Sequence, residues 1–140
     1  MLKGIPSILS PDLLKMLMEM GHGNELVIGD GNFPAAACAQ RLVRLDGHGV
    51  PEILAAVLQL FPLDQFEQDR VFLMKTADGE DAFIWGRYEE IIRREEPDFP
   101  GFAHIERFSF YERAKQAYAV IATGEQALYA NIILKKGVIS

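Results

Sequence analysis

Among the three histidines of the chain, only His22 stands between two glycines, in the segment Gly21-His22-Gly23. An imidazole changes its charge near neutral pH, and flanking glycines allow a substrate to approach the ring closely. These properties predict a general acid or base at this position. A solvent-exposed loop histidine without a chemical role is the alternative interpretation. His48 lies in a polar turn and His104 precedes a strand-to-helix segment, so we interpret both as surface or hydrogen-bonded residues.

Two further polar groups stand beside apolar segments. Asp30 ends the β-branched apolar run 25–30, where the letters Gly-Asp-Gly-Asn predict a turn. Near the C-terminus, Tyr129-Ala130-Asn131 combines an aromatic ring with an amide. A carboxylate, an amide and a phenol offer both donors and acceptors without a large charge. Together with the histidine, these groups favour a neutral polyhydroxyl ligand.

Other chemistries lack the residues that they need. No HxxxH, CxxC or HxH spacing occurs, so we expect no metal site. Neither GxGxxG nor GxxxxGK[ST] occurs, which argues against a nucleotide cofactor. Cys38 follows three alanines, and an apolar setting raises the pKa of a thiol. We therefore interpret Cys38 as a small core residue rather than a nucleophile.

Composition excludes several classes of protein. A chain of 140 residues, of which 49% are hydrophobic, predicts one globular domain over residues 1–140. The net charge of -6 opposes binding to nucleic acid. No apolar run approaches the roughly 18 residues of a membrane span, so we expect a soluble protein without a membrane partner. The single cysteine and the lack of a secretory leader pattern predict a cytoplasmic location.

Periodic apolar patterns predict the elements that position these groups. Ser10-Pro11-Asp12 supplies an N-cap, a proline at the first helical position and an acid at the positive end of the helix dipole. We expect a mostly buried helix from Pro11 to about Met20. The run 25–30 is then a strand. The same reasoning places strands at 40–45 and 71–75, and helices at 51–60 and 85–95.

The last third of the chain combines a helix with two strands. Ser109 and Glu112 match a capping box, so a helix should begin there. Strand patterns follow at 118–122 and 128–134, and the turn Thr123-Gly124-Glu125 between them predicts a hairpin. The order of elements predicts an α/β fold with a mixed sheet.

Several short segments form a set that spans nearly the whole chain. They are the opening Met-Leu-Lys-Gly-Ile-Pro, then 9–14, 19–24, 29–30, 33–35, 44–47, 107–114, 123–125 and 129–138. The set resembles the L-fucose mutarotase family, whose sister is the D-ribose pyranase family. In the ribose branch a histidine commonly stands at the position of Arg107, so the fucose branch is the closer one. One departure is Gly31-Asn32-Phe33, where the fucose branch has a histidine.

The resemblance implies a fold, a site and an assembly. The fold is a single domain with a mixed β-sheet flanked by helices, a three-layer α/β/α arrangement like that of D-ribose pyranase. His22 corresponds to the proton donor, and the sugar is held by Asp30, Arg107, Tyr129, Ala130 and Asn131. No cofactor is implied. Family members form dimers or rings of ten subunits, with active sites near subunit contacts.

The activity that follows is interconversion of the α and β anomers of a free monosaccharide, with L-fucose as the first choice, by acid/base ring opening and reclosure. In this hypothesis His22 protonates the ring oxygen, and a bound water or Asp30 takes the hydroxyl proton. Arg107 and Asn131 should project into the pocket that holds His22, where Phe33 or Tyr129 covers the methyl group of the sugar.

Several alternatives stay open. Asp30 could be a structural acceptor that orients His22 or caps a turn, and Arg107 could pair with an acid. The chain could instead interconvert pyranose and furanose forms as a D-ribose pyranase does. It could also be a non-catalytic monosaccharide-binding accessory of sugar uptake, or an interaction module without a small-molecule site.

Overall fold

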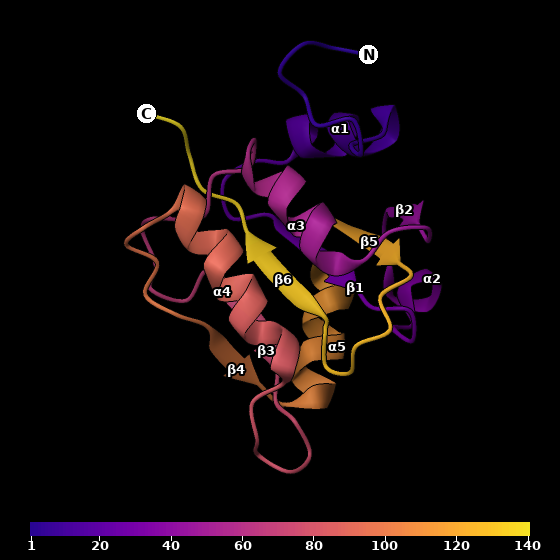
Figure 1. Cartoon of the computed structure of the whole chain (residues 1–140), viewed down its shortest axis with the longest axis vertical. Coiled ribbons are helices and arrows are strands. Elements are labelled where there is room, and N and C mark those ends of the chain that lie inside the picture. The colour runs from indigo at the N-terminus through magenta and orange to yellow at the C-terminus, as the bar shows by residue number, and fades with distance from the viewer.

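The computed structural model describes residues 1–140, which form five helices and six strands (Figure 1). The helices are α1 (Pro11–Glu19), α2 (Ala35–Cys38), α3 (Val50–Leu58), α4 (Phe83–Glu95) and α5 (Arg107–Gln116). The strands are β1 (Glu25–Gly29), β2 (Leu42–Leu45), β3 (Val71–Met74), β4 (Ala103–Ile105), β5 (Ala119–Thr123) and β6 (Ile132–Lys135). No helix has the length and apolar character needed to cross a membrane.

All six strands join one mixed sheet in the order β2-β5-β1-β6-β3-β4. Strand β1 is parallel to β5 on one side and antiparallel to β6 on the other. The predicted hairpin between the last two strands is therefore wrong, because β1 lies between β5 and β6. The turn residues at 123–125 indicate that the chain reverses there, but they do not specify which strand pairs with β5.

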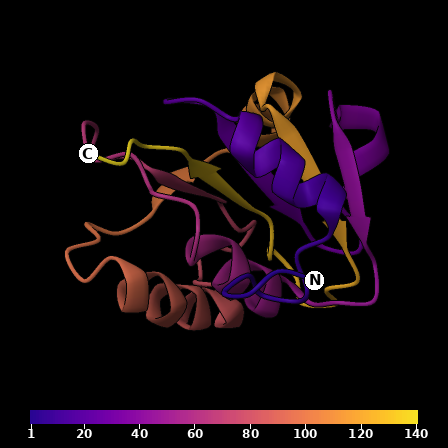
Figure 2. The same cartoon turned by 90° about the horizontal axis from the view of Figure 1, so that it is seen from above.

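The sheet is covered on both faces, so its strands read as continuous apolar runs rather than alternating ones. In β1, Leu26 and Ile28 pack into a cluster of 27 buried residues with α1, α3 and α4. Val27, which points to the opposite face, packs into a second cluster of 12 residues with α2 and α5. Figure 2 shows α3 and α4 on one side of the sheet and α5 and α2 on the other. The predicted three-layer α/β/α fold is confirmed.

Helix α1 begins as the sequence predicts, because Ser10 Oγ accepts a hydrogen bond from the Leu13 N–H at 3.2 Å. The expectation that this helix is mostly buried is wrong. Only Leu13 and Leu17 are buried within it, and Met18 is 85% exposed. The helix packs one face on the core and presents Met18 to solvent.

Helix α5 begins two residues before the predicted capping box. Glu106 is its N-cap, with the carboxylate accepting a hydrogen bond from the Ser109 N–H at 3.1 Å. Arg107 is consequently the first residue of the helix. The short elements α2 and β4, of four and three residues, were not predicted because they are too short to show a period.

Candidate functional site

Asp30 and Asn131 meet where β1 ends and β6 is about to begin. The two strands are antiparallel with Ile28 opposite Ile132, so the residue after β1 faces the segment before β6. The Asp30 N–H donates to Asn131 Oδ1 at 2.8 Å, and both residues are more than nine-tenths buried. Because this bond uses the amide oxygen, the amide nitrogen of Asn131 is left as a donor for a ligand.

The Asp30 carboxylate has an unusual environment. Its Oδ1 accepts a hydrogen bond from the Asn32 N–H at 2.9 Å. Burial raises the pKa of this carboxyl most strongly, while backbone N–H groups of Asn32, Ala130 and Phe33 oppose the rise. The charge of Glu125 adds to it, and the net pKa lies above the ordinary aspartate value. A carboxylate with raised proton affinity is suited to accept a proton.

Helix α4 fixes the backbone of residues 129–131. The Trp85 Nε1–H donates to the Tyr129 carbonyl at 2.9 Å, and the Tyr88 hydroxyl donates to the Ala130 carbonyl at 2.7 Å. Tyr129 is the one non-glycine residue with positive φ, at 55°. Such a conformation costs roughly 1–3 kcal/mol, which the surrounding structure must offset. The Ala130 side chain is fully buried, so only its backbone can reach a ligand.

Arg107 lies beside this segment, at the start of α5. Its guanidinium carbon is 5.6 Å from the ring centre of Phe108 and 5.6 Å from that of Tyr111. None of the ion pairs in the chain involves Arg107. The pairing of Arg107 with an acid, which the sequence left open, is not found. The donors of the guanidinium are free to face a ligand.

Asp30, Arg107, Tyr129 and Asn131 line one cavity of about 290 Å³. This volume is at the lower end of the range for small-molecule pockets, roughly 300–1,000 Å³. Its remaining walls come from residues of mixed character, namely Asn32, Phe33, Met74, Tyr111 and Leu128. A lining that combines polar groups with aromatic and apolar side chains suits a small ligand with both hydroxyl groups and an apolar part.

Four of these lining residues were not predicted. Tyr111 follows Arg107 by about one helical turn, so a correct start for α5 would have indicated it. Asn32 was noted only as a departure from the fucose branch. Met74 and Leu128 come from the end of β3 and from the loop before β6, and no sequence signal singles them out.

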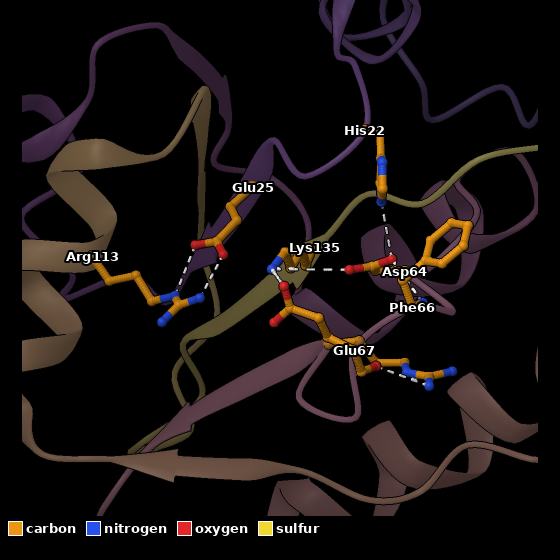
Figure 3. A network of polar contacts seen from close by, with 8 residues as sticks. His22, Glu25, Asp64, Phe66, Glu67, Arg113 and Lys135 are labelled. Carbon is orange, nitrogen blue, oxygen red and sulfur yellow. Dashed lines mark hydrogen bonds and ion pairs between the residues drawn. The ribbon is translucent and has the colours of Figure 1, made fainter.

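His22 lies near the opposite end of the β1–β6 pair (Figure 3). The Gly23 N–H donates to the Lys136 carbonyl at 2.8 Å, which ties this loop to the end of β6. His22 Nε2 is 3.2 Å from Asp64 Oδ1, and its ring centre is 5.2 Å from that of Phe66. The side chain is 46% exposed. The Nε2 atom of His22 therefore contacts a carboxylate, and Nδ1 is the ring nitrogen that does not make this contact.

An apolar groove of about 590 Å³ runs beside His22, between α1 and the C-terminal segment. Met18 and Ile139 line it, and each is 85% exposed. Phe66, which packs on the imidazole, is also largely exposed. Large apolar side chains in such a patch are a common feature of surfaces that bind another protein.

The predicted site residues thus fall into two groups within one chain. Five residues of β1 separate the groups, and at about 3.3 Å per residue they stand roughly 17 Å apart. The expectation that Arg107 and Asn131 project into the pocket of His22 is wrong for a single chain. Asp30 does not orient His22 either, since Asp64 occupies that position.

The other chemically notable residues have structural surroundings. Cys38 is buried in the core, and burial raises the pKa of its thiol, as predicted. His48 Nδ1 is 3.2 Å from Glu52 Oε1 at the surface, and the ring centre of His104 is 5.1 Å from that of Trp85. No three His, Cys, Asp or Glu side chains are grouped so as to hold a metal ion.

Known proteins resemble the chain over almost all of its length. Residues 3–139 match the model of the RbsD / FucU transport protein family. The fucose mutarotase of Danio rerio is 48% identical, with 99% of this chain and 94% of that protein covered. The crystal structure of the fucose mutarotase in complex with L-fucose from Streptococcus pneumoniae superposes with a TM-score of 0.95 at 50% identity. That comparison covers 99% of this chain and 100% of the other.

The Bacillus subtilis RbsD structure, complexed with D-ribose, is a more distant neighbour. It superposes with a TM-score of 0.74 at 22% identity, and both chains are fully covered. At that identity the similarity concerns the fold alone.

Proposed function

Because the chain belongs to the RbsD / FucU transport protein family, we propose that it interconverts the α and β anomers of L-fucose. The observation that carries this proposal is the buried Asp30–Asn131 pair in a small cavity. The chain that encloses this cavity is 50% identical to a fucose mutarotase crystallised with L-fucose. The activity is an isomerisation of a free sugar.

The chemistry requires two proton transfers. A proton must reach the ring oxygen while another leaves the anomeric hydroxyl, so that the ring opens to an aldehyde, C1 turns and the ring recloses. In our proposal His22 supplies the first proton. A bound water or Asp30 accepts the second, and burial gives the Asp30 carboxyl a raised pKa that suits this role. Arg107, Tyr129 and Asn131 hold the hydroxyl groups of the sugar.

We further propose that a second copy of the chain completes the site. His22 and the Asp30 cavity are too far apart within one chain for both to touch a single monosaccharide. Exposed apolar side chains border both groups: Met18, Phe66 and Ile139 near His22, and Leu128 and Phe108 near the cavity. An interface in which one copy presents His22 to the cavity of its neighbour would cover both borders. A dimer or a ring can satisfy this contact.

The cavity walls also support a 6-deoxy sugar. Phe33 and Tyr129 both line the cavity, and an aromatic face can cover the methyl group of L-fucose. Asn32 also lines the cavity, and its amide can donate to or accept from a hydroxyl group of the sugar. L-Fucose, rather than D-ribose, is therefore the substrate that we propose.

We propose a cytoplasmic location on the basis of Cys38. It is the single cysteine of the chain, and it is free and buried. A protein without disulfides suits a reducing compartment.

Magnetisation-transfer NMR on equilibrated L-fucose and D-ribose tests the proposed activity directly, because it measures exchange between anomers without a coupled reaction. Catalytic amounts of the protein should accelerate exchange of L-fucose more than exchange between the forms of D-ribose. If the protein accelerated exchange of D-ribose more than exchange of L-fucose, D-ribose would replace L-fucose as the proposed substrate. Binding of L-fucose without any acceleration would overturn the proposal in favour of a non-catalytic accessory of sugar uptake.

A further inference from the structure

The segment Thr123-Gly124-Glu125, where β5 ends, packs closely against the turn between β2 and α3. The Gly124 N–H donates to the His48 carbonyl at 2.9 Å. A Cβ atom at Gly124 would collide with the Asp46 carbonyl oxygen, so only glycine fits there. In Figure 1 the chain after β5 passes the start of α3 before it enters β6. This packing brings Glu125 to the first turn of α3.

The carboxylate of Glu125 is bonded to two segments at once. Its Oε1 accepts a hydrogen bond from the Val50 N–H, at the start of α3, at 3.1 Å. Its Oε2 accepts from the Gln126 and Ala127 N–H groups at 3.0 and 3.1 Å. The first N–H groups of a helix have no partner within the helix, so an anionic acceptor there is stabilising. Both oxygens of the side chain are therefore in use.

The backbone of Glu125 is bonded to the loop that carries Asp30. Its carbonyl accepts from the Gly31 N–H at 2.8 Å. Its N–H donates to the Thr123 hydroxyl at 3.1 Å, and that hydroxyl donates to the Gly29 carbonyl at 2.8 Å. A Cβ atom on Gly31 would lie 3.0 Å from the Glu125 carbonyl oxygen, so this close approach requires glycine. Asp30 is therefore held by bonds to the residues on both sides of it.

The same segment leads directly into the wall of the Asp30 cavity. Leu128 and Tyr129 follow the turn at 126–127, and they line the cavity together with Asp30. The place of this turn relative to Asp30 depends on Glu125, because the side chain of Glu125 holds the turn while its backbone holds the Asp30 loop. Two parts of the cavity wall are thus joined through one residue.

We propose that Glu125 is a positioning residue of the Asp30 cavity. Its carboxylate holds the turn at 126–127 on the start of α3, while its carbonyl holds the Gly31 N–H. The two bonded segments carry Leu128 and Asp30, which are thereby kept at a fixed separation in the cavity wall. The effect on catalysis rests on the proposed function, in which Asp30 contacts the sugar. The positioning itself rests on the bonds of Glu125.

Only a carboxylate of this length can hold both segments. Glutamine has one oxygen, so its NH₂ group would face either the Val50 N–H or the N–H groups of the turn, donor against donor. Aspartate keeps the charge but is one methylene shorter, so it cannot reach both segments from the same backbone position. Glu125→Gln and Glu125→Asp therefore each break part of the set of bonds, and they differ in whether the negative charge remains.

Glu52 offers a matched control, because it is another acid at the start of the same helix. Its Oε1 accepts from the Gly49 N–H at 3.0 Å and lies 3.2 Å from His48 Nδ1. None of its hydrogen bonds or ion pairs reaches the turn at 126–127 or the Asp30 loop. Glu52→Gln therefore removes the same charge from the same helix start without touching the cavity wall.

The first measurement is hydrogen–deuterium exchange of the intact protein, read by mass spectrometry on overlapping peptides. In wild type the amides of Gly31, Val50 and Ala127 should exchange slowly, because each donates a hydrogen bond to Glu125. Rapid exchange of these amides in wild type would overturn the proposal, even if the variants failed to fold.

The variants test whether Glu125 acts on the cavity wall. Glu125→Gln and Glu125→Asp should each speed deuterium uptake by up to roughly tenfold in peptides that cover residues 30–33 and 126–131, the effect of losing a hydrogen bond. Glu52→Gln should leave both peptides unchanged. Unchanged uptake at 30–33 and 126–131 in the folded Glu125 variants would overturn the proposal, and so would equal changes in Glu52→Gln.

The second measurement is the rate of anomer exchange at saturating L-fucose, on protein that circular dichroism shows to be folded at the assay temperature. Both Glu125 variants should be slower by roughly 10- to 100-fold, because a displacement of about 1 Å at a reacting group has an effect of this size. Glu52→Gln should stay within about twofold of wild type.

Two results would contradict a positioning role. If Glu125 served stability alone, its variants would unfold at a lower temperature while the folded protein exchanged L-fucose at the wild-type rate. If it acted through its charge alone, Glu125→Asp would exchange at nearly the wild-type rate. If wild type exchanges no sugar, the proposed function fails instead, and the deuterium uptake still decides the role of Glu125 because it requires no sugar.

Discussion

His22 and Asp30 stand at opposite ends of the same strand, β1, although only seven residues lie between them in the sequence. An extended strand rises about 3.3 Å per residue, so the residues at the two ends of β1 lie far apart in space. A monosaccharide in the Asp30 cavity must therefore receive its proton from a histidine of another chain, if His22 is the donor.

Mixed oligomers test this relationship. His22→Ala and Asp30→Ala chains should each be inactive alone, because every site lacks one group. When the two are co-expressed or unfolded and refolded together, about a quarter of the sites should combine an intact histidine with an intact aspartate. Anomer exchange should then return to about a quarter of the wild-type rate. If both groups acted within one chain, mixing would restore nothing.

Replacing His22 by Gln should lower the rate of L-fucose exchange by about 10²-fold or more, the usual contribution of one general acid. The fold should remain, because the side chain is nearly half exposed. His48→Gln is a suitable control, since His48 is a surface residue paired with Glu52. Near-normal exchange in a folded His22→Gln protein would exclude His22 as the donor.

Arg107→Ala should weaken binding of L-fucose by about 1–3 kcal/mol, because hydroxyl groups of the sugar lose a charged hydrogen-bond donor. The measurement is a titration of each protein with L-fucose, D-ribose and L-galactose. Arg94→Ala, in the last turn of α4, provides a matched loss of charge at a distance from the cavity. Equal affinity of wild type for all three sugars would contradict the choice of L-fucose.

Tyr88→Phe should destabilise the protein by about 1–3 kcal/mol, since the buried Ala130 carbonyl loses its hydrogen bond of 2.7 Å. Sugar affinity should also fall, because this bond holds the backbone beside Asn131. Thermal unfolding and the L-fucose titration measure the two effects. Tyr118→Phe, at a partly exposed ring stacked on Arg41, should change neither.

The stability contributed by Asp64 should depend on pH in a defined direction. Its folded-state pKa lies below the ordinary value of 3.8, so the ionised group stabilises the fold above about pH 3.8. That contribution is lost as the pH falls through the folded-state pKa. Asp64→Asn should therefore be less stable than wild type near pH 6, by about 1–3 kcal/mol. The difference should shrink below pH 4, as denaturant titrations at several pH values would show.

The sequence by itself determined the features that depend on neighbouring residues. Ser10 caps α1, Asp30 follows β1 and Cys38 lies in the core, because helix caps, apolar runs and local polarity are all encoded within a few positions. The set of segments that resembles the L-fucose mutarotase family, and with it the fold class, was likewise visible along the chain.

Only the tertiary structure decided which segments meet. Strand β1 lies between β5 and β6, and this register places Asp30 beside Asn131, 101 residues later. Asp64 lies 42 residues from His22 and has no motif around it, so its contact with the imidazole could not be predicted. Such pairs depend on the path of the chain between them, and local patterns carry no information about that path. The separation of His22 from the Asp30 cavity was likewise decided by the structure. The two residues are close in the sequence, but the extended strand β1 lies between them and holds them apart.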